Sequence, residues 1–334
     1  MSGNRPTVRV AVFGAGSWAN RTHIPNLLKL EGVEIVAVCD VNRQAAEETA
    51  AAFGISNTYT DGHALLDAGG IDALFSCVPA YARVDVEAAA AERGIHLFSE
   101  KPQATTMAVA RRIDEAVARG GVLSTVCFRE RYRPIFQEAR RLLAEREVTH
   151  VRFISAGGAP GRRAQVSGDS WHHDMDRAGG RAFDWGVHAV DYIRFMSGLD
   201  VAAAQAFYHH PPAYVSPLSC SFNLQLSHGG TATLSFFAGT SQDPWFTFYF
   251  DGGNLAIHRY DRITVNGDTV YEAEDFDPWL EQDRIFVEAV RRGDGSAILN
   301  DYHDGLYSLS PVLAGWESAR RGGECLDVAA FMGA

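Results

Sequence analysis

Residues 8–19 read VRVAVFGAGSWA, in which a short apolar run leads directly into the pattern G-x-G-x-x-A. β-Branched residues dominate the run and a helix-period stretch from Ile24 to Leu30 follows, which predicts a strand, a turn and a helix. Gly14 permits the tight turn, Gly16 lets the backbone approach a diphosphate, and the small Ala19 lets helix and strand pack closely. The pattern indicates a dinucleotide site, with a plain glycine turn in an α/β core as the alternative.

An acidic residue follows the second predicted strand. Residues 34–39 form another apolar run that ends at Asp40, at about the distance from the glycines at which an acid binds ribose hydroxyls. Its carboxylate favours NAD because it would repel the 2′-phosphate of NADP, whereas Arg43 leaves NADP open as the alternative. The other residues expected at the cofactor lie in loops that follow predicted strands: Ser17, Trp18, Val41, Cys77, Val78, Pro79, Glu100 and Lys101.

Lysine is rare in this chain. Only two of the thirty basic residues are lysines, Lys29 and Lys101, and the second lies in Glu100-Lys101-Pro102, directly after the apolar run 95–98. The pKa of a lysine can be lowered into a working range, whereas a guanidinium stays protonated. We interpret Lys101 as a group that exchanges a proton. The alternative is an ordinary surface lysine, which is what we expect of Lys29.

Length and composition are typical of a globular protein with two domains. At 334 residues the chain exceeds the usual size of a single core, and 46% of its residues are hydrophobic. A net charge of −11 argues against nucleic-acid and anionic-membrane binding. The five cysteines show no C-x-x-C spacing, no apolar run approaches the length of a membrane span, and the N-terminal residues lack the apolar region of a signal peptide. We therefore expect a cytoplasmic protein with reduced thiols.

Strand and helix signals alternate as far as residue 126. Strands are expected at 8–13, 34–39, 72–76, 95–98 and 122–126, with helices at 24–30, 44–53, 84–92 and 105–119. This alternation predicts an N-terminal Rossmann domain, residues 1–126, built on a doubly wound parallel sheet. Ligands of such sheets bind beyond the carboxyl ends of the strands, where the glycines, Asp40, Pro79 and Lys101 are expected to lie.

Residues 127–334 are expected to form a second domain that binds the substrate and mediates oligomers. A helix at 134–145 and a strand at 148–155 precede an irregular stretch rich in glycine and arginine, and further strands are expected at 202–208, 220–226, 231–237, 246–250 and 255–258. They favour an α+β domain on one open, largely antiparallel sheet. A second subunit would cover the open face, so we expect a homo-oligomer. The fold class is α/β followed by α+β.

Asp184 and His188 carry the densest chemistry of the second domain, within the segment 179–191, GGRAFDWGVHAVD. Being four residues apart, they would share one face of a helix and address one small substrate together. An imidazole suits the removal of a proton from an alcohol that also loses a hydride. The alternative is an amphipathic helix in which Asp184 is a cap and His188 is a packed, hydrogen-bonded core residue.

Two further features of this half are candidates for binding. Trp171 and Tyr132 would stack on a sugar ring or belong to the core. The pattern His172-His173-x-x-Asp176 does not favour zinc, because adjacent histidines point in different directions on any regular element and no cysteine lies nearby. We therefore expect no metal site.

Taken together, these residues resemble the Gfo/Idh/MocA oxidoreductases over almost the whole chain. The matching segments are Gly14-x-Gly16-x-x-Ala19, Asp40, Glu100-Lys101-Pro102, Arg131-Tyr132-x-Pro134, Trp171 ahead of Gly179-Gly180, and Asp184-x-x-x-His188-x-x-Asp191. The resemblance implies an NAD(P)-dependent oxidoreductase that acts on a hydroxyl or keto group of a sugar, cyclitol or sugar derivative. It implies that Lys101 and His188 handle the proton while Asp184 orients the hydroxyl. We take His188 as the base and Lys101 as the group that polarises the oxygen.

The chain departs from the family pattern in two places. Ala80 and Arg83 stand after Pro79 where the family often has Asn and His, and Arg129 stands at the expected substrate wall where Asn is frequent. An anionic substrate is one interpretation of the arginines in this half, and water-facing arginines are the other: Arg162, Arg163, Arg177 and Arg181. Two other functions also stay open, a redox-neutral NAD-dependent glycosidase and a non-catalytic sensor of NAD or sugar.

Overall fold

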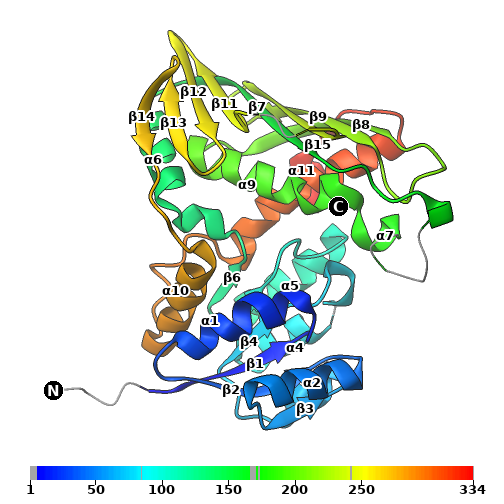
Figure 1. Cartoon of the computed structure of the whole chain (residues 1–334), viewed down its shortest axis with the longest axis vertical. Coiled ribbons are helices and arrows are strands. Elements are labelled where there is room, and N and C mark those ends of the chain that lie inside the picture. The colour runs from blue at the N-terminus through cyan, green and yellow to red at the C-terminus, as the bar shows by residue number, and fades with distance from the viewer. Residues whose placement is uncertain (1–5, 84, 166–170, 172–173, 241–242, 334) are drawn as a thin grey trace. The chain divides into compact units, whose positions relative to one another are not determined.

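The computed structural model describes residues 6–83, 85–165, 171, 174–240 and 243–333 (Figure 1). The chain divides into two compact units: unit 1 takes residues 1–129 and 277–305, and unit 2 takes residues 130–276 and 306–334. Residues 277–305 therefore belong with the N-terminal part of the chain, a return that the sequence patterns do not indicate. Among the described residues, none of the helices has both the length and the apolar character needed to cross a lipid bilayer.

Unit 1 is built on six parallel strands in the order β3-β2-β1-β4-β5-β6. The order reverses at β1, as it does in doubly wound dinucleotide-binding sheets, so the predicted Rossmann architecture is confirmed. The strands are β1 (Val8–Phe13), β2 (Val33–Cys39), β3 (Asn57–Tyr59), β4 (Ala73–Ser76), β5 (His96–Ser99) and β6 (Ser124–Val126).

Side chains cap the N-termini of the unit 1 helices α2, α3, α5 and α10. Asn42 accepts the N–H groups of Gln44 and Ala45 at the start of α2, and Asp277 does the same for α10. The helical segments are η1 (Ala19–His23, a π-helix), α1 (Ile24–Lys29), α2 (Arg43–Phe53), α3 (Gly62–Asp67), η2 (Ala80–Ala82), α4 (Val86–Glu92), α5 (Met107–Gly120) and α10 (Pro278–Arg292).

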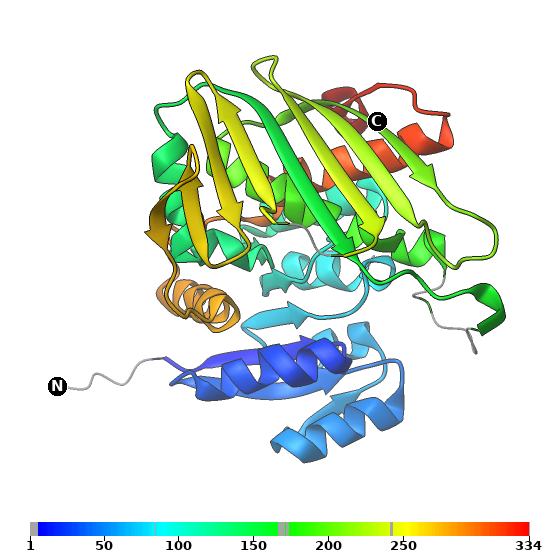
Figure 2. The same cartoon turned by 45° about the horizontal axis from the view of Figure 1, so that its top comes forward.

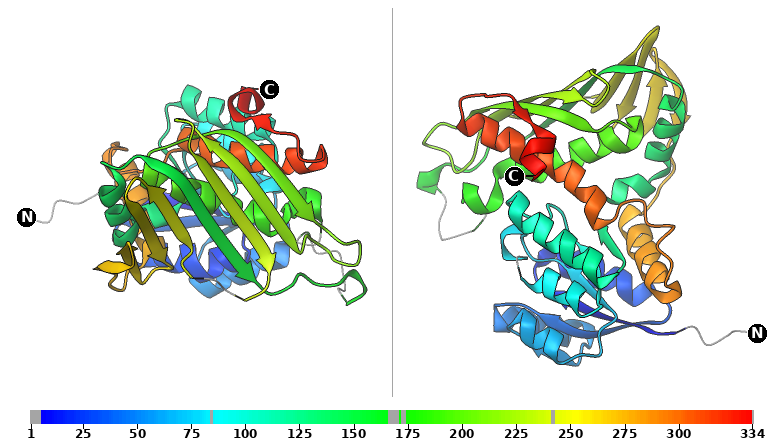
Figure 3. Two further views of the ribbon diagram at one scale, coloured as in Figure 1. Left: turned by 90° about the horizontal axis from the view of Figure 1, so that it is seen from above. Right: turned by 180° about the vertical axis from the view of Figure 1, so that it is seen from behind.

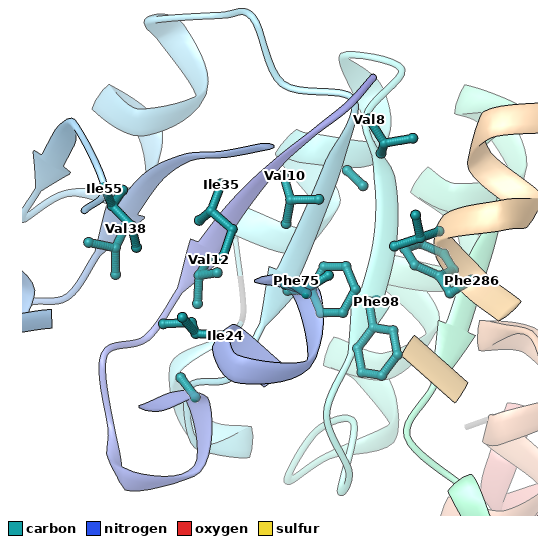
Figure 4. Packing of buried hydrophobic residues seen from close by; sticks show 14 of the residues in the cluster. Val8, Val10, Val12, Ile24, Ile35, Val38, Ile55, Phe75, Phe98 and Phe286 are labelled. Atoms are coloured by element: carbon teal, nitrogen blue, oxygen red, sulfur yellow. The ribbon is translucent and has the colours of Figure 1, made fainter. Parts of the chain in front are cut away.

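A continuous cluster of buried apolar side chains fills unit 1 (Figure 4). The rings of Phe75 on β4 and Phe98 on β5 stack with their centroids 4.5 Å apart. Phe286 on α10 lies edge-on to both rings, at 5.6 and 5.5 Å. Burying such a side chain contributes about 1.5–3 kcal/mol. Because α10 comes from residues 278–292, the core of unit 1 is complete only when this late segment joins it.

Unit 2 contains a nine-stranded sheet in the order β14-β13-β12-β11-β7-β10-β9-β8-β15 (Figure 2). β7 and β10 pair in parallel and the other described pairings are antiparallel, so the predicted open, largely antiparallel sheet is confirmed. The strands are β7 (Val148–Gly157), β8 (Val201–His209), β9 (Ser219–Leu226), β10 (Thr231–Ala238), β11 (Phe246–Phe250), β12 (Gly253–His258), β13 (Arg262–Val265), β14 (Asp268–Glu272) and β15 (Leu326–Asp327).

Helices cover one face of this sheet. Phe136 on α6 packs against Tyr192 on α9, and Tyr192 packs against Phe246 on β11, with ring centroids 4.9 and 5.9 Å apart. Residues alternate along β9 between buried and exposed, and the exposed side chains line the opposite face, seen in the left view of Figure 3. The helical segments of this half are η3 (Arg129–Tyr132), α6 (Pro134–Leu143), η4 (Arg163–Gln165), α7 (Met175–Ala178), α8 (Gly180–Asp184), α9 (Gly186–Ser197), α11 (Tyr302–Arg320) and α12 (Val328–Gly333).

A buried ionic network joins α4 to the ends of β4 and β5. The guanidinium of Arg83 is 2% exposed and donates two hydrogen bonds to the carbonyl of Val78, at 3.0 and 2.8 Å. It also donates to Ser99 Oγ at 3.2 Å, and Ser99 Oγ donates to Glu87 Oε1 at 3.0 Å. Burial raises the pKa of Glu87, which Arg83, 3.8 Å away, counteracts. Arg83 is therefore a structural residue that fixes the loop after β4.

Arg83→Met should lower the free energy of unfolding by about 3 kcal/mol, because it leaves the Glu87 carboxylate buried without its cation. Protonation of Glu87 relieves this penalty, so the loss should be small at acidic pH and should grow as pH rises through the raised pKa that Glu87 has in the folded wild-type protein. Urea unfolding across this pH range measures both effects. The double variant Arg83→Met/Glu87→Met should recover most of the loss, and a single variant within about 0.5 kcal/mol of wild type would contradict the assignment.

Candidate cofactor and catalytic site

The two glycines after β1 meet different surroundings. Gly14 has φ +105°, and a Cβ on it would lie 2.9 Å from the backbone of Cys77 and of Val78, so the fold itself requires glycine there. A Cβ on Gly16 would meet nothing within 4 Å. Ala19 is fully buried under the following helix. The loop therefore has one glycine that packs against the protein and one that leaves room for a ligand.

Asp40 lies beside this loop at the end of β2. Its Oδ2 accepts the backbone N–H of Ala15 at 2.8 Å and its Oδ1 accepts that of Asn42 at 2.9 Å. Each carboxylate oxygen keeps a further lone pair that can accept a ribose hydroxyl. Arg43 begins α2, and its side chain is 74% exposed and forms a long ion pair with Glu47. The structure thus brings Asp40 and the glycine loop together, as predicted, and leaves Arg43 facing solvent.

The loops after β4 and β5 reach the same edge of the sheet. Cys77 follows β4 and donates its N–H to the carbonyl of Phe13 on β1 at 2.7 Å. Burial raises the pKa of its thiol to about 12, so the thiol is neutral at physiological pH and does not suit the role of a nucleophile. Lys101 follows β5 and is half-buried. Lys101 therefore stands on the same row of strand ends as the glycine loop, Asp40 and Pro79.

His23 is a polar core residue that the sequence analysis overlooked. Its Nδ1 lies 2.9 Å from Asp283 Oδ1 and its Nε2 lies 2.9 Å from Glu100 Oε1, and the ring has no exposed surface. Burial opposes a charged imidazole, but the Asp283 carboxylate raises the pKa of His23 well above its ordinary range. Asp283 shares a face of α10 with Phe286 and Val287, and this i, i+3, i+4 spacing is the signal that could have found it.

Cys127 lies next to this cluster at the end of β6. Its Sγ and ligand atoms of His23 and Glu100 all lie within 4.8 Å of one another, a spacing that a metal ion could use. Both ring nitrogens of His23 already face carboxylates, and burial raises the pKa of the Cys127 thiol to about 12. We therefore interpret the group as a hydrogen-bonded cluster. The earlier candidates His172 and His173 lie outside the described residues.

In unit 2, Asp184 and His188 belong to two helices and not to the single helix that was predicted. α8 ends at Asp184 and the chain turns at Trp185 before α9 begins. His188 is 3% exposed, and its Nδ1 lies 3.2 Å from the hydroxyl of Tyr192, one turn further along α9. Asp184 is half-buried. The hydrogen bond to Tyr192 fixes the orientation of the His188 ring.

Asp191, which also lies on α9, connects this helix to neighbouring segments of unit 2. The guanidinium of Arg131 donates to both of its carboxylate oxygens at 2.6–3.1 Å, and the hydroxyl of Ser308 donates to its Oδ1 at 2.9 Å. Tyr132, next to Arg131, is 8% exposed, which agrees with the core alternative for this residue, and Trp171 is half-buried. The segment 131–134 therefore supports α9.

Two family descriptions match most of this architecture. One, described as the oxidoreductase family with an NAD-binding Rossmann fold, matches residues 8–128, and the C-terminal domain of GFO/IDH/MocA proteins matches residues 136–256. The chain belongs to the Gfo/Idh/MocA family. Unit 1 accordingly contains the NAD-binding Rossmann fold of this family.

Characterised relatives and solved structures agree with this placement. D-glucoside 3-dehydrogenase from Escherichia coli is 28% identical over 57% of this chain, but the match spans only about half of that enzyme, 54%. The dTDP-3,4-didehydro-2,6-dideoxy-alpha-D-glucose 3-reductase of Streptomyces antibioticus is 27% identical over 87% of this chain and 90% of its own. An oxidoreductase from Thermotoga maritima has the same fold, with a TM-score of 0.84, 21% identity, and coverage of 97% of this chain and 99% of its own.

The arginines that were considered for binding an anionic substrate contact other residues of their own units. Arg129 is 8% exposed, and its guanidinium stacks 4.4 Å above the ring of Trp279, which in turn lies edge-on to Trp18. In unit 2 the contacts are those of Arg162 with the ring of Tyr214, Arg163 with the carbonyl of Pro212, Arg177 with Asp174, and Arg181 with Ser155 and the carbonyl of Ala156.

Alanine at the two glycines should separate folding from cofactor binding. Gly14→Ala forces a positive φ and a backbone clash, and should lower the free energy of unfolding by about 1–3 kcal/mol. Gly16→Ala should fold like wild type but bind NAD about 10-fold or more weakly, because its methyl group occupies the space kept for the diphosphate. Denaturant unfolding and calorimetric titration with NAD measure the two effects. Unchanged NAD affinity in Gly16→Ala would move the diphosphate away from this loop.

Proposed function

We propose that this protein is an NAD-dependent dehydrogenase or reductase that transfers a hydride between the nicotinamide ring and a hydroxyl or keto group of a sugar, cyclitol or sugar derivative. The observation that carries the proposal is the row of strand ends in unit 1, where an open glycine, a ribose-binding carboxylate and one of the two lysines of the chain follow neighbouring strands. NAD supplies the hydride acceptor. NADP stays the alternative cofactor because of the exposed Arg43.

We assign the transfer of the substrate's hydroxyl proton to two residues, His188 and Lys101. Oxidation of an alcohol removes a hydride from carbon and a proton from oxygen, and His188 is proposed to accept that proton. Lys101 is proposed to polarise the same oxygen with its ammonium group, and Asp184 to orient the substrate hydroxyl. The contact of His188 Nδ1 with the hydroxyl of Tyr192 supports this role, because it holds the imidazole ring in one orientation.

The substrate class follows from the relatives together with the contacts of the arginines. One relative acts on a D-glucoside and the other on a nucleotide-linked deoxysugar. Since the arginines of unit 2 contact rings, carbonyls and carboxylates of the protein, we favour a neutral sugar or cyclitol over an anionic one. We further propose a homo-oligomer that uses the open face of the nine-stranded sheet, and a reducing, cytoplasmic setting, supported by five free cysteines.

Replacing each lysine in turn tests the function. Lys101→Arg keeps the positive charge but cannot release a proton, so it should lower kcat by about 10²-fold or more while the NAD affinity stays near wild type. Lys29→Arg is the matched control, because Lys29 is the only other lysine, and should leave kcat unchanged. NADH formation from a panel of glucosides, cyclitols and polyols is the assay. Stoichiometric NADH supports a dehydrogenase, and near-normal turnover by Lys101→Arg would remove Lys101 from the mechanism.

His188→Ala gives an independent test in unit 2. The loss of the proposed base should lower kcat by about 10²-fold or more without weakening NAD. Tyr192→Phe, which removes only the hydroxyl that orients the ring, should show a smaller loss of the same kind. Unchanged kcat in His188→Ala would assign the base to another residue.

The cofactor preference has its own test at Asp40. Asp40→Ala should weaken NAD by about 10-fold or more and NADP much less, because the carboxylate binds ribose hydroxyls but repels a 2′-phosphate. Asp40→Asn keeps the size of the side chain and one oxygen, which can accept the N–H of Ala15 or of Asn42 but not both, so it separates the loss of charge from the loss of the side chain. Calorimetric titration with both cofactors measures the preference. Equal losses for NAD and NADP would place the preference elsewhere.

A further inference from the structure

We propose that His23 and Asp283 are positioning residues that hold the Glu100 carboxylate in place and, through it, the backbone of Lys101. This inference deepens the proposed function and rests on it. Neither residue needs to touch substrate or cofactor. Their task is to fix where β5 delivers the lysine.

Hydrogen bonds link Asp283 to Lys101 step by step. Asp283 accepts from Asn26 Nδ2 at 3.1 Å and faces His23 Nδ1 at 2.9 and 3.1 Å through its two oxygens. His23 Nε2 lies 2.9 Å from Glu100 Oε1. The other oxygen of Glu100, Oε2, accepts the backbone N–H of Lys101 at 3.0 Å.

Glu100 also holds the glycine loop. Its Oε1 accepts the indole N–H of Trp18 at 2.6 Å, and Trp18 is one of the residues expected at the cofactor. One buried carboxylate therefore has two partners from the proposed site, the loop residue Trp18 and the backbone of Lys101. Its third partner, His23, comes from the core.

The contacts of His23 require its imidazole ring to carry a positive charge. Its ring packs edge-on against Phe98 at 5.1 Å and near Phe75 at 5.9 Å, while the groups that can titrate around it are Asp283, Glu100, Cys77 and Cys127. Two carboxylates facing both ring nitrogens are satisfied together only when each nitrogen carries a proton. Burial would raise the pKa of Glu100, but the hydrogen bond and charge of His23 hold it at about 2. Glu100 thus stays an acceptor.

The helical segment η1 turns the side chain of His23 toward the core of unit 1. Residues Ala19–His23 form a π-helix, whose hydrogen bonds span one residue more than those of the α-helix that follows, and His23 is its last residue. Without the imidazolium, a buried Glu100 would gain a proton or turn away, and the N–H of Lys101 would lose its acceptor. A displacement of even about 1 Å at a catalytic group can cost about 10²-fold in rate.

The two lysines allow a direct measurement that needs no activity. Selective ¹⁵N-lysine labelling of the full chain gives backbone amide signals from Lys29 and Lys101 alone, and Lys29→Arg assigns them. In His23→Gln the amide of Lys101 should shift upfield and exchange with solvent about 10-fold or more faster. Asp283→Asn, which keeps the shape of the side chain and removes its charge, should move the same signal in the same direction.

His96→Ala is the matched control. His96 Nδ1 accepts the N–H of Leu123 at 2.9 Å at the opposite end of β5, so this variant also removes a histidine hydrogen bond from the same strand. It should lower stability without moving the Lys101 signal. An unchanged Lys101 amide in both His23→Gln and Asp283→Asn would overturn the proposal, whether or not the protein proves to be a dehydrogenase.

Kinetics supply the second measurement. His23→Gln should lower kcat by about 10- to 100-fold with NAD affinity near wild type, and should cost nothing further when Lys101 is already replaced by alanine. A purely structural role would instead multiply the two losses, and that result would also overturn the proposal. If wild type forms no NADH with any substrate of the panel, the proposed function fails, while the amide signal still decides the positioning role.

Discussion

The close approach of Gly14 to the backbone of Cys77 and Val78 is the constraint on which unit 1 depends. It brings the loop after β1 against the loop after β4, with less than the space of one methyl group between them. Parallel pairing then places the carboxyl ends of β2 and β5 on the same edge of the sheet. Asp40 and Lys101, which are far apart in the sequence, are therefore brought to this edge by strand pairing alone. A site made of backbone turns and short loops follows from the sheet order itself.

The sequence was informative wherever the signal was local. The glycine pattern, Asp40 and Lys101 all follow apolar runs that a strand explains, and the structure places each at a strand end. His23 and Asp283 escaped notice because their contact spans 260 positions, and neither residue type is unusual in a helix. In the sequence, Arg83 was noted only as a departure from the family pattern. Only the fold shows that it turns inward to Glu87 and Val78.

In unit 2, too, local sequence signals did not reveal contacts between distant segments, in this case the order of the strands in the sheet. Alternating apolar and polar residues predicted an open sheet, but this alternation does not reveal which strands are neighbours. β7 pairs in parallel with β10, although 73 residues separate the end of β7 from the start of β10. The spacing of Asp184 and His188 suggested one helix because both residues tolerate helical backbone. The turn at Trp185 separates them into two helices, which no propensity of a single residue indicates.

Two buried ionic networks converge on consecutive residues at the end of β5. Ser99 is the last residue of β5, and Glu100 follows it directly. Ser99 contacts Arg83 and Glu87, whereas Glu100 contacts His23, which in turn contacts Asp283. Burying so many charges is costly, and well-packed apolar residues of similar volume would often be as stable. What the charges add is direction, because their hydrogen bonds hold two consecutive residues immediately before Lys101 and one of them accepts the backbone N–H of Lys101.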